Sequence, residues 1–384
     1  MKATKLFISF FESEKAGGLV LLICSVISII LSNSYFSESY LALWHYPIGN
    51  HNAEYWINDG LMTIFFLLIG LELEREIYTG ELSKISAAIL PISGALGGML
   101  IPALLYFGFN FGTNTQSGIG IPMATDIAFA IGILSLLGNK IPVSLKVFLT
   151  ALAVIDDLGA IILIALFYTK TIYFSNLLIS LSVFGILLIM NRLKVKRLIL
   201  YLIGGFIMWY FMLNSGVHAT ITGVLLAFAI PYQDGSDKTI SYKLLHWLHK
   251  PVAFIIIPLF ALSNTAIILG KDWYNNFSES YSLGIIFGLV IGKPLGIVTF
   301  AFLAVKLKLT ELPKELNWKK IVGVGFLGGI AFTMSIFVTL LAFEDPKIIN
   351  NSKFMILIAS LISGIIGYVW LKQNSKSSNN KSIK

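Results

Sequence analysis

The sequence predicts an all-helical membrane protein with about twelve transmembrane helices. Of its 384 residues, 56% are hydrophobic and only 12% are charged, about half of the roughly 25% charged residues of a typical soluble domain. The apolar residues form long runs, many close to the roughly 20 residues that a helix needs to cross about 30 Å of hydrocarbon. Such runs are unlike the alternating segments of a membrane β-barrel. No polar stretch of domain size interrupts them, so we expect one transmembrane domain over residues 1–384, with a polar tail over about 372–384.

Twelve apolar segments are candidate spans. The first follows Lys2 and Lys5 and so resembles a signal peptide. However, Glu12 and Glu14 intervene and no clear small-residue cleavage site follows, so we expect a retained span. The expected spans cover residues 15–32, 58–76, 87–108, 120–137, 144–168, 174–191, 198–213, 217–231, 249–269, 283–304, 321–343 and 353–371.

The segment between the first two expected spans, "YLALWHYPIGNHNAEYWIN", is rich in aromatic and turn-forming residues and contains no Lys or Arg. We expect it to form a short hairpin at the surface. The single cysteine, Cys24, lies inside an apolar run and cannot form an intrachain disulfide.

The positive charges predict the orientation of the chain. Lys and Arg gather in alternate loops, as expected for loops on the cytoplasmic side, so we expect both termini in the cytoplasm and an even number of spans. The net charge of +8 is therefore a topology signal and does not indicate nucleic-acid binding. The expected cytoplasmic group is Arg192, Lys194, Lys196, Arg197, Lys238, Lys243, Lys250, Lys306, Lys308, Lys314, Lys319, Lys320, Lys372, Lys376, Lys381 and Lys384, and the opposite loops hold Lys170, Lys271, Lys347 and Lys353.

Four charged residues remain near the middle of expected spans: Asp126, Asp156, Asp157 and Lys293. Each charge at a helix centre costs about 2.5–3.5 kcal/mol on insertion scales, so four unpaired charges would cost roughly 10–14 kcal/mol. That rivals the whole stability of a domain, about 5–15 kcal/mol. The three acids must therefore be paired, hydrated or protonated.

Two interpretations of these charges remain open. One is a structural ion pair between Lys293 and one aspartate, which leaves two acids unexplained. The other pairs one acid with Lys293 while its neighbour faces a wet cavity, because adjacent helical residues diverge by about 100°. Burial and an acidic neighbour favour a carboxyl that holds either a proton or a small cation. Hard oxygen ligands of this kind suit Na⁺ or Li⁺.

Two segments contain residues that favour an interrupted helix. Pro122, Thr125 and Asp126 begin the short apolar run of "PMATDIAFAIG", and "GVGFLGGIAF" contains four glycines. Broken helices inside a membrane are tolerated where they line a cavity or are buried in protein. Asp126 would offset the positive N-terminal end of a half-helix, and Lys293 a negative C-terminal end. Close helix packing is the alternative explanation of the glycines. The two segments share Ile-Ala-Phe, which suggests an internal repeat.

Motifs along nearly the whole chain resemble the NhaA family of bacterial Na⁺/H⁺ antiporters. The resemblance runs from "FFESEKAGGLVLL" to "SGIIGYVWL", and "ATDIAFAIG" with "ALAVIDDLGAIILIALFY" is its most specific part. "FFLLIGLELERE", "SGVHATITG", "IGKPLGI" and "GGIAFTMSIF" also match, in the same order. The resemblance implies twelve helices, with inverted repeats whose two interrupted helices cross at mid-membrane. It also implies electrogenic export of one Na⁺ or Li⁺ for two protons, serving pH and sodium homeostasis without a cofactor, by a homodimer of the inner membrane paired through the first outside loop.

The resemblance also assigns roles to individual residues. It implies that Asp156 and Asp157 bind the cation and protons, that Thr125 and Asp126 lie at the crossing, and that Lys293 forms a salt bridge with Asp156. A pH-responsive group is implied as well. An ordinary solvated helix end is the alternative for its acidic and arginine members, and an ordinary buried histidine is the alternative for His218. The chain departs from the family at Leu245, where an acidic residue is usual. The implied pH-responsive residues are Glu72, Arg75, Glu76, His218, His246 and His249.

Three other functions fit an all-helical membrane protein. A symporter of a small organic anion would need a cationic or hydroxyl-rich pocket, for which Lys293 alone is thin support. An intramembrane enzyme is disfavoured, because the chain has neither an HExxH motif nor a Gly-x-Gly-Asp motif. A passive channel would show flux without coupling.

Overall fold

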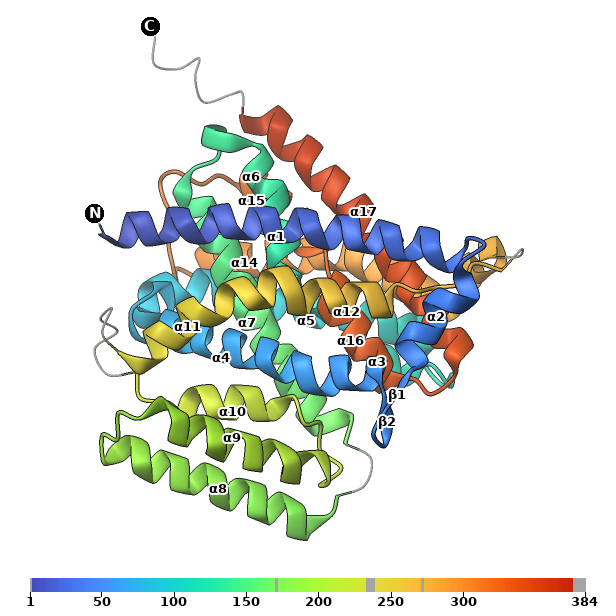
Figure 1. Ribbon diagram of the computed structural model, residues 1–384. Helices are drawn as coiled ribbons and strands as arrows, with labels where there is room; N and C mark the ends of the chain where they lie inside the picture. The colour runs from blue at the N-terminus through green and yellow to red at the C-terminus, as the bar shows by residue number, and fades with distance from the viewer. Residues whose placement is uncertain (1, 170–171, 233–238, 271–272, 376–384) are drawn as a thin grey trace, which may run out of the picture. The chain divides into compact units, whose positions relative to one another are not determined.

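The computed structural model describes residues 2–169, 172–232, 239–270 and 273–375, and is almost entirely helical (Figure 1). The chain divides into two compact units. The first comprises the described parts of 1–23, 84–160 and 267–384, and the second comprises those of 24–83 and 161–266. Helices α1 (Lys2–Ser32) and α7 (Val143–Phe167) contribute to both units. Six lysines used to predict orientation lie outside the described residues: Lys170, Lys238, Lys271, Lys376, Lys381 and Lys384.

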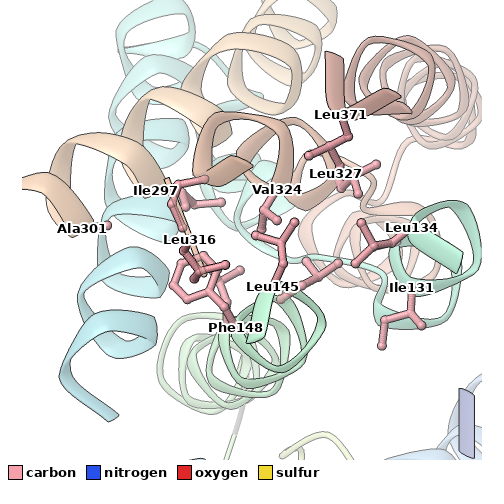
Figure 2. Packing of buried hydrophobic residues seen from close by; sticks show 14 of the residues in the cluster. Ile131, Leu134, Leu145, Phe148, Ile297, Ala301, Leu316, Val324, Leu327 and Leu371 are labelled. Carbon is pink, nitrogen blue, oxygen red and sulfur yellow. The ribbon is translucent and has the colours of Figure 1, made fainter. Parts of the chain in front are cut away.

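The first unit is built around an apolar core that joins α5, α6, α7, α14, α15 and α17 (Figure 2). Phe148 of α7 lies beside Ile297 of α14, and Leu327 of α15 lies beside Leu371 of α17. Residues from six helices share this core, so the unit buries many of its apolar side chains inside protein. Its elements are α5 (Ile85–Asn110), η3 (Gln116–Met123), α6 (Ile127–Leu136), η4 (Gly138–Lys140), the first part of α7, η6 (Trp273–Ser278), α13 (Ser280–Phe287), η7 (Gly288–Gly292), α14 (Lys293–Lys306), α15 (Trp318–Gly328), α16 (Phe332–Ala342) and α17 (Pro346–Ser375).

Two helix pairs in the first unit are interrupted, as the sequence predicts. Residues 124–126 separate η3 from α6, and residues 329–331 separate α15 from α16, which are bent by 45° relative to each other. Asp126 N donates to Ile330 O at 2.6 Å, so the two breaks lie side by side. A backbone N–H of one break is thus bonded to a backbone C=O of the other, whereas in a continuous helix both groups would be bonded within the helix.

The second unit contains three helices that lie side by side, α8, α9 and α10 (Figure 1). Helix α10 also packs closely against α4, because a Cβ added at Gly70 would lie 2.6 Å from Ala227 Cβ. The elements of this unit, besides the second parts of α1 and α7, are α2 (Ser37–His45), β1 (Pro47–Ile48), β2 (His51–Asn52), α3 (Ala53–Tyr55), η1 (Trp56–Leu61), α4 (Met62–Tyr78), η2 (Glu81–Ser83), α8 (Phe174–Arg192), α9 (Leu198–Leu213), α10 (Ile221–Ala229), α11 (Ile240–Pro251), η5 (Val252–Ile256) and α12 (Ile257–Asn264).

The expected surface hairpin is confirmed. Strands β1 and β2 pair antiparallel, with Pro47 opposite Asn52 and Ile48 opposite His51. Gly49 in the turn has φ +66°, a conformation that glycine adopts at little cost. Trp56 Nε1 donates to Ile48 O at 2.9 Å and fixes the hairpin to the start of the next helix.

The helices follow one another along the chain in the order of the expected spans, although some are too short to cross a membrane. Each of the twelve expected spans overlaps one to three consecutive helical elements. In the described part of the chain, eight helices are long and apolar enough to cross a membrane, or up to ten if each bent pair is one span. Helix α9, with 16 residues, and α10, with 9, are shorter than a full span.

Helices α5 and α14 cross where Gly97 and Gly296 bring their backbones into contact. A Cβ at either glycine would overlap backbone atoms of the other helix, which cannot move aside as a flexible side chain can. We therefore expect Gly296→Ala to lower the free energy of unfolding by about 1–3 kcal/mol or more. A thermal melt in detergent measures this effect. Gly108→Ala is the matched control, because nothing lies within 4 Å of its added Cβ and alanine favours helix over glycine. Equal melting of the Gly296 variant and wild type would contradict the close approach.

Candidate functional site

The two adjacent aspartates lie near the middle of α7 and are buried. Asp156 is 0% exposed and Asp157 is 3% exposed. Because neighbouring residues of a helix diverge by about 100°, the two carboxyl groups leave the helix in different directions. Asp156 faces the interrupted helices and α14, as its contacts with Thr125 and Lys293 show.

Lys293 is fully buried and pairs with Asp156. Its Nζ lies 2.6 Å from Asp156 Oδ2, and both side chains are 0% exposed. Lys293 also donates to the carbonyl of Met123, the last residue of η3. The ammonium therefore meets one full negative charge and the negative end of a short helix. Lys293 begins α14 directly after the π-helical turn η7, and turns of this kind occur often at functional sites.

The two oxygens of Asp156 have different surroundings. Oδ2 accepts from Lys293, and Thr125 Oγ1 lies 2.8 Å from it and 2.8 Å from Gly328 O. A hydroxyl has one hydrogen, so Thr125 donates to one of these oxygens at a time. Oδ1 of Asp156 accepts no hydrogen bond from the described residues. A buried carboxylate oxygen normally has a partner, so Oδ1 has room in its bonding for a proton or a cation.

Asp126 caps two helices at once. Its Oδ1 accepts from Phe129 N at 3.2 Å in the first turn of α6. Its Oδ2 accepts from Thr333 N at 3.1 Å and from Thr333 Oγ1 at 2.8 Å in the first turn of α16. The carboxylate thus lies at two helix N-termini, where a negative charge is stabilising. These contacts occupy both oxygens, unlike those of Asp156.

The donor set suits a weakly held alkali cation better than a tightly bound metal. Among the described residues, no three His, Cys, Asp or Glu side chains come together as metal ligands. The oxygens near Lys293 are instead the two carboxylates of α7, the Thr125 hydroxyl and the carbonyls at the breaks. Oxygen ligands of this kind suit hard cations, and a carboxylate can also take a proton. Each carboxylate of this set is chemically able to take either a proton or a hard cation.

The residues predicted to respond to pH form a separate group in the second unit. Glu72 is buried at 8% exposure, and Arg75 Nη2 lies 3.0 Å from Glu76 Oε1. His249 of α11 lies within electrostatic reach of Arg75. His246 is exposed on the same helix, and its ring stacks on Tyr242 with centroids 4.4 Å apart.

His218 lies apart from the other predicted pH-responsive residues. It is in the connection between α9 and α10, and its Nε2 is 3.2 Å from Tyr168 O. The structure therefore brings Glu72, Arg75, Glu76 and His249 to neighbouring helices, whereas His218 contacts the residue that follows α7.

Sequence reasoning missed two residues that shape the site. Thr333 holds Asp126 through both its backbone and its hydroxyl, and Met123 accepts from Lys293. A threonine directly after the predicted break was the available signal for the first, because threonine often caps a helix. A backbone carbonyl carries no signal in the sequence.

The chain matches known proteins over nearly its full length. Residues 8–371 match the model of the family described as Na⁺/H⁺ antiporter 1. The chain belongs to the Na⁺/H⁺ antiporter 1 family. It is 66% identical to the Na⁺/H⁺ antiporter NhaA of Flavobacterium psychrophilum, over 97% of both chains. It is also 57% identical to NhaA of Cytophaga hutchinsonii, over 98% of this chain and 97% of that one, and 44% identical to NhaA of Escherichia coli, over 94% and 97%.

A solved structure shares the fold at low sequence identity. The sodium proton antiporter MjNhaP1 from Methanocaldococcus jannaschii superposes with a TM-score of 0.56 at 15% identity, over 98% of this chain and 99% of that one. Membership of the Na⁺/H⁺ antiporter 1 family, together with several long apolar helices, makes the protein a multi-pass integral membrane protein and a transporter. These relatives give no support to a symporter of organic anions.

Proposed function

We propose that this member of the Na⁺/H⁺ antiporter 1 family is a secondary active transporter that exports Na⁺ or Li⁺ in exchange for protons. The observation that carries the proposal is the pairing of Asp156 with Lys293 through one oxygen, with Asp157 next to it in sequence. Such a site is stable without a cation and has a carboxylate oxygen ready for one.

The proposed cycle follows from competition for the same groups. A cation that enters binds Asp156 and Asp157, displaces one proton from Asp157 and one from the Lys293 ammonium, and so breaks the pair between Asp156 and Lys293. On the other side of the membrane the cation leaves, one proton returns to Asp157 and one to Lys293, and Lys293 pairs with Asp156 again. One cation leaves for two protons that enter, so each cycle moves one net positive charge inward and is electrogenic.

Thr125, Asp126 and Lys293 compensate charge in this proposal. Asp126 keeps two helix N-termini in place, and Lys293 neutralises the empty site. Thr125 donates to either Asp156 or the Gly328 carbonyl. When a cation binds Asp156, the hydroxyl can therefore switch its hydrogen bond from Asp156 to Gly328. No resident cofactor is needed for this exchange.

We further propose that Glu72, Arg75, Glu76, His218, His246 and His249 respond to pH. The ion pair between Arg75 and Glu76 and the nearby His249 support this role, because a change in the charge of His249 acts on Arg75 and so on its ion pair. Leu245 is buried at 5% exposure where the family usually has an acid. Helix α11 of this chain therefore carries one acidic side chain fewer in the group that we propose responds to pH.

We also propose the membrane in which the transporter lies, its orientation there and the surface through which it pairs. We place it in the bacterial inner membrane with both termini in the cytoplasm, in agreement with the loops rich in Lys and Arg. The β1–β2 hairpin, with its exposed Ile48, is the surface through which we propose that two copies pair.

Fluorescence dequenching in everted vesicles tests the exchange. We expect addition of Na⁺ or Li⁺ to dissipate a preformed proton gradient, and addition of K⁺ to leave it intact. The measurement is repeated across a pH series, because protonated carboxyls bind cations poorly. Equal responses to all three ions, or cation flux without proton movement, would instead indicate a passive channel.

A further inference from the structure

One peptide in the break between α15 and α16 is held from both sides. The carbonyl of Ile330 accepts from Asp126 N at 2.6 Å, and the N–H of the next residue, Ala331, donates to Ser360 Oγ at 3.2 Å. Ile330 is 2% exposed, Ala331 0% and Ser360 8%. Both hydrogen bonds are therefore shielded from water, where losing one costs most.

The carbonyl and the N–H belong to the same planar unit. A trans peptide is rigid, and its C=O and N–H point in opposite directions. Turning one group therefore turns the other. The bond that Ser360 makes to Ala331 consequently sets the direction of the Ile330 carbonyl, which receives the backbone of Asp126.

Helix α16 has no cap of its own at this end. Its N-cap residue is Ala331, whose side chain cannot accept a hydrogen bond, whereas α6 is capped by its own Asp126. The N–H groups at the start of α16, which have no partner within the helix, are bonded by side chains of other elements instead. Asp126 bonds the N–H of Thr333, and Ser360 bonds the N–H of Ala331.

The face of α17 that carries Ser360 is shaped to reach the break. Ser363 lies one turn further along, with its Oγ 2.7 Å from where a Cβ of Gly329 would be. Gly364 approaches Ile330 Cδ1, which is 3.5 Å from the position of its missing Cβ. These small residues let α17 lie close enough to the backbone for a serine to bond it.

We propose that Ser360 is a positioning residue for the ion site. It holds the Ile330–Ala331 peptide, which holds the backbone of Asp126 and so the adjacent Thr125 that contacts Asp156. Nothing in this chain of contacts requires Ser360 to touch an ion. The role rests on the proposed function, because it concerns the affinity of that same site for Na⁺.

The test compares two serines of one helix. Ser360→Ala leaves the Ala331 N–H without its acceptor, and we expect the KM for Na⁺ to rise about fivefold, the factor that corresponds to one ordinary hydrogen bond. The maximal rate per folded protein should change less than about twofold on the same reasoning. Ser363→Ala is the matched control, because Ser363 Oγ is buried and has no hydrogen-bond partner among the described residues. Ser360→Thr keeps the hydroxyl and should restore the KM.

A second measurement does not depend on transport. Amide hydrogen exchange of peptides that cover residues 329–334 should be faster in Ser360→Ala and unchanged in Ser363→Ala. If both alanine variants match an active wild type in KM and in exchange, the role of Ser360 is wrong and the proposed function stands. If the wild type shows no Na⁺-dependent proton movement, the proposed function fails and the role fails with it.

Discussion

Asp157→Asn should abolish Na⁺-driven proton exchange in proteoliposomes. Asparagine has nearly the same shape as aspartate but carries no charge and does not bind or release a proton near neutral pH. A full charge lost about 4 Å from a cation, at an effective dielectric constant of about 20, costs about 4 kcal/mol, or roughly a thousandfold in affinity. Because Asp157 is only 3% exposed, bulk water does not screen this loss completely.

The control for this variant is Asp345→Asn. Asp345 is exposed and bonds the backbone N–H of Lys347 next to the start of α17, so its neutralisation should leave exchange at the wild-type rate. Both variants should melt near the wild-type temperature, which separates loss of function from loss of fold. Full exchange by Asp157→Asn would remove this residue from the site.

Lys293→Ala should destabilise the protein more than it weakens cation binding. Lys293 and Asp156 are both 0% exposed, and removal of one member of a buried pair typically costs about 3–5 kcal/mol because the other charge is left alone. The cation affinity should fall less, since the cation itself can compensate Asp156 once the lysine is gone. A melt in detergent without Na⁺, compared with one in high Na⁺, measures both effects.

Two further variants show whether the loss of stability comes from the broken ion pair or from the loss of a lysine side chain in general. Asp156→Asn combined with Lys293→Ala removes both members of the ion pair, so neither is left without the other and the double variant should recover part of the lost stability. Lys306→Ala changes an exposed lysine at the end of the same helix and should melt like wild type. Unchanged melting of Lys293→Ala would contradict the pairing.

The interrupted helices and the mid-span charges could be predicted from the sequence, since both break an apolar pattern. Proline and glycine in short apolar runs indicated the breaks, and charges inside apolar runs must have partners. The residues alone could not choose between Asp156 and Asp157 as the partner of Lys293. That choice depends on the rotation of α7 about its axis, which is fixed by packing against α14 and the breaks.

The contacts that hold the breaks could not be predicted. Ser360 and Thr333 are ordinary polar residues in apolar helices. Ser360 bonds a backbone N–H, a group that nearly every residue possesses, and Thr333 bonds the carboxylate of Asp126, which lies 207 residues away in the chain. Such pairs arise only when distant segments come together. The short helices α9 and α10 illustrate a related limit, because an apolar run in the sequence can include turn residues at its ends.

Proton release on Na⁺ binding tests most directly whether cation and proton compete for the same carboxyl groups. Purified protein in weakly buffered detergent near neutral pH receives NaCl or KCl while a pH dye is followed. We predict acidification with NaCl that saturates with Na⁺, is absent with KCl and is lost in Asp157→Asn. Saturable Na⁺ binding by the wild type without any release of protons, at every pH tried, would contradict exchange at the aspartate pair.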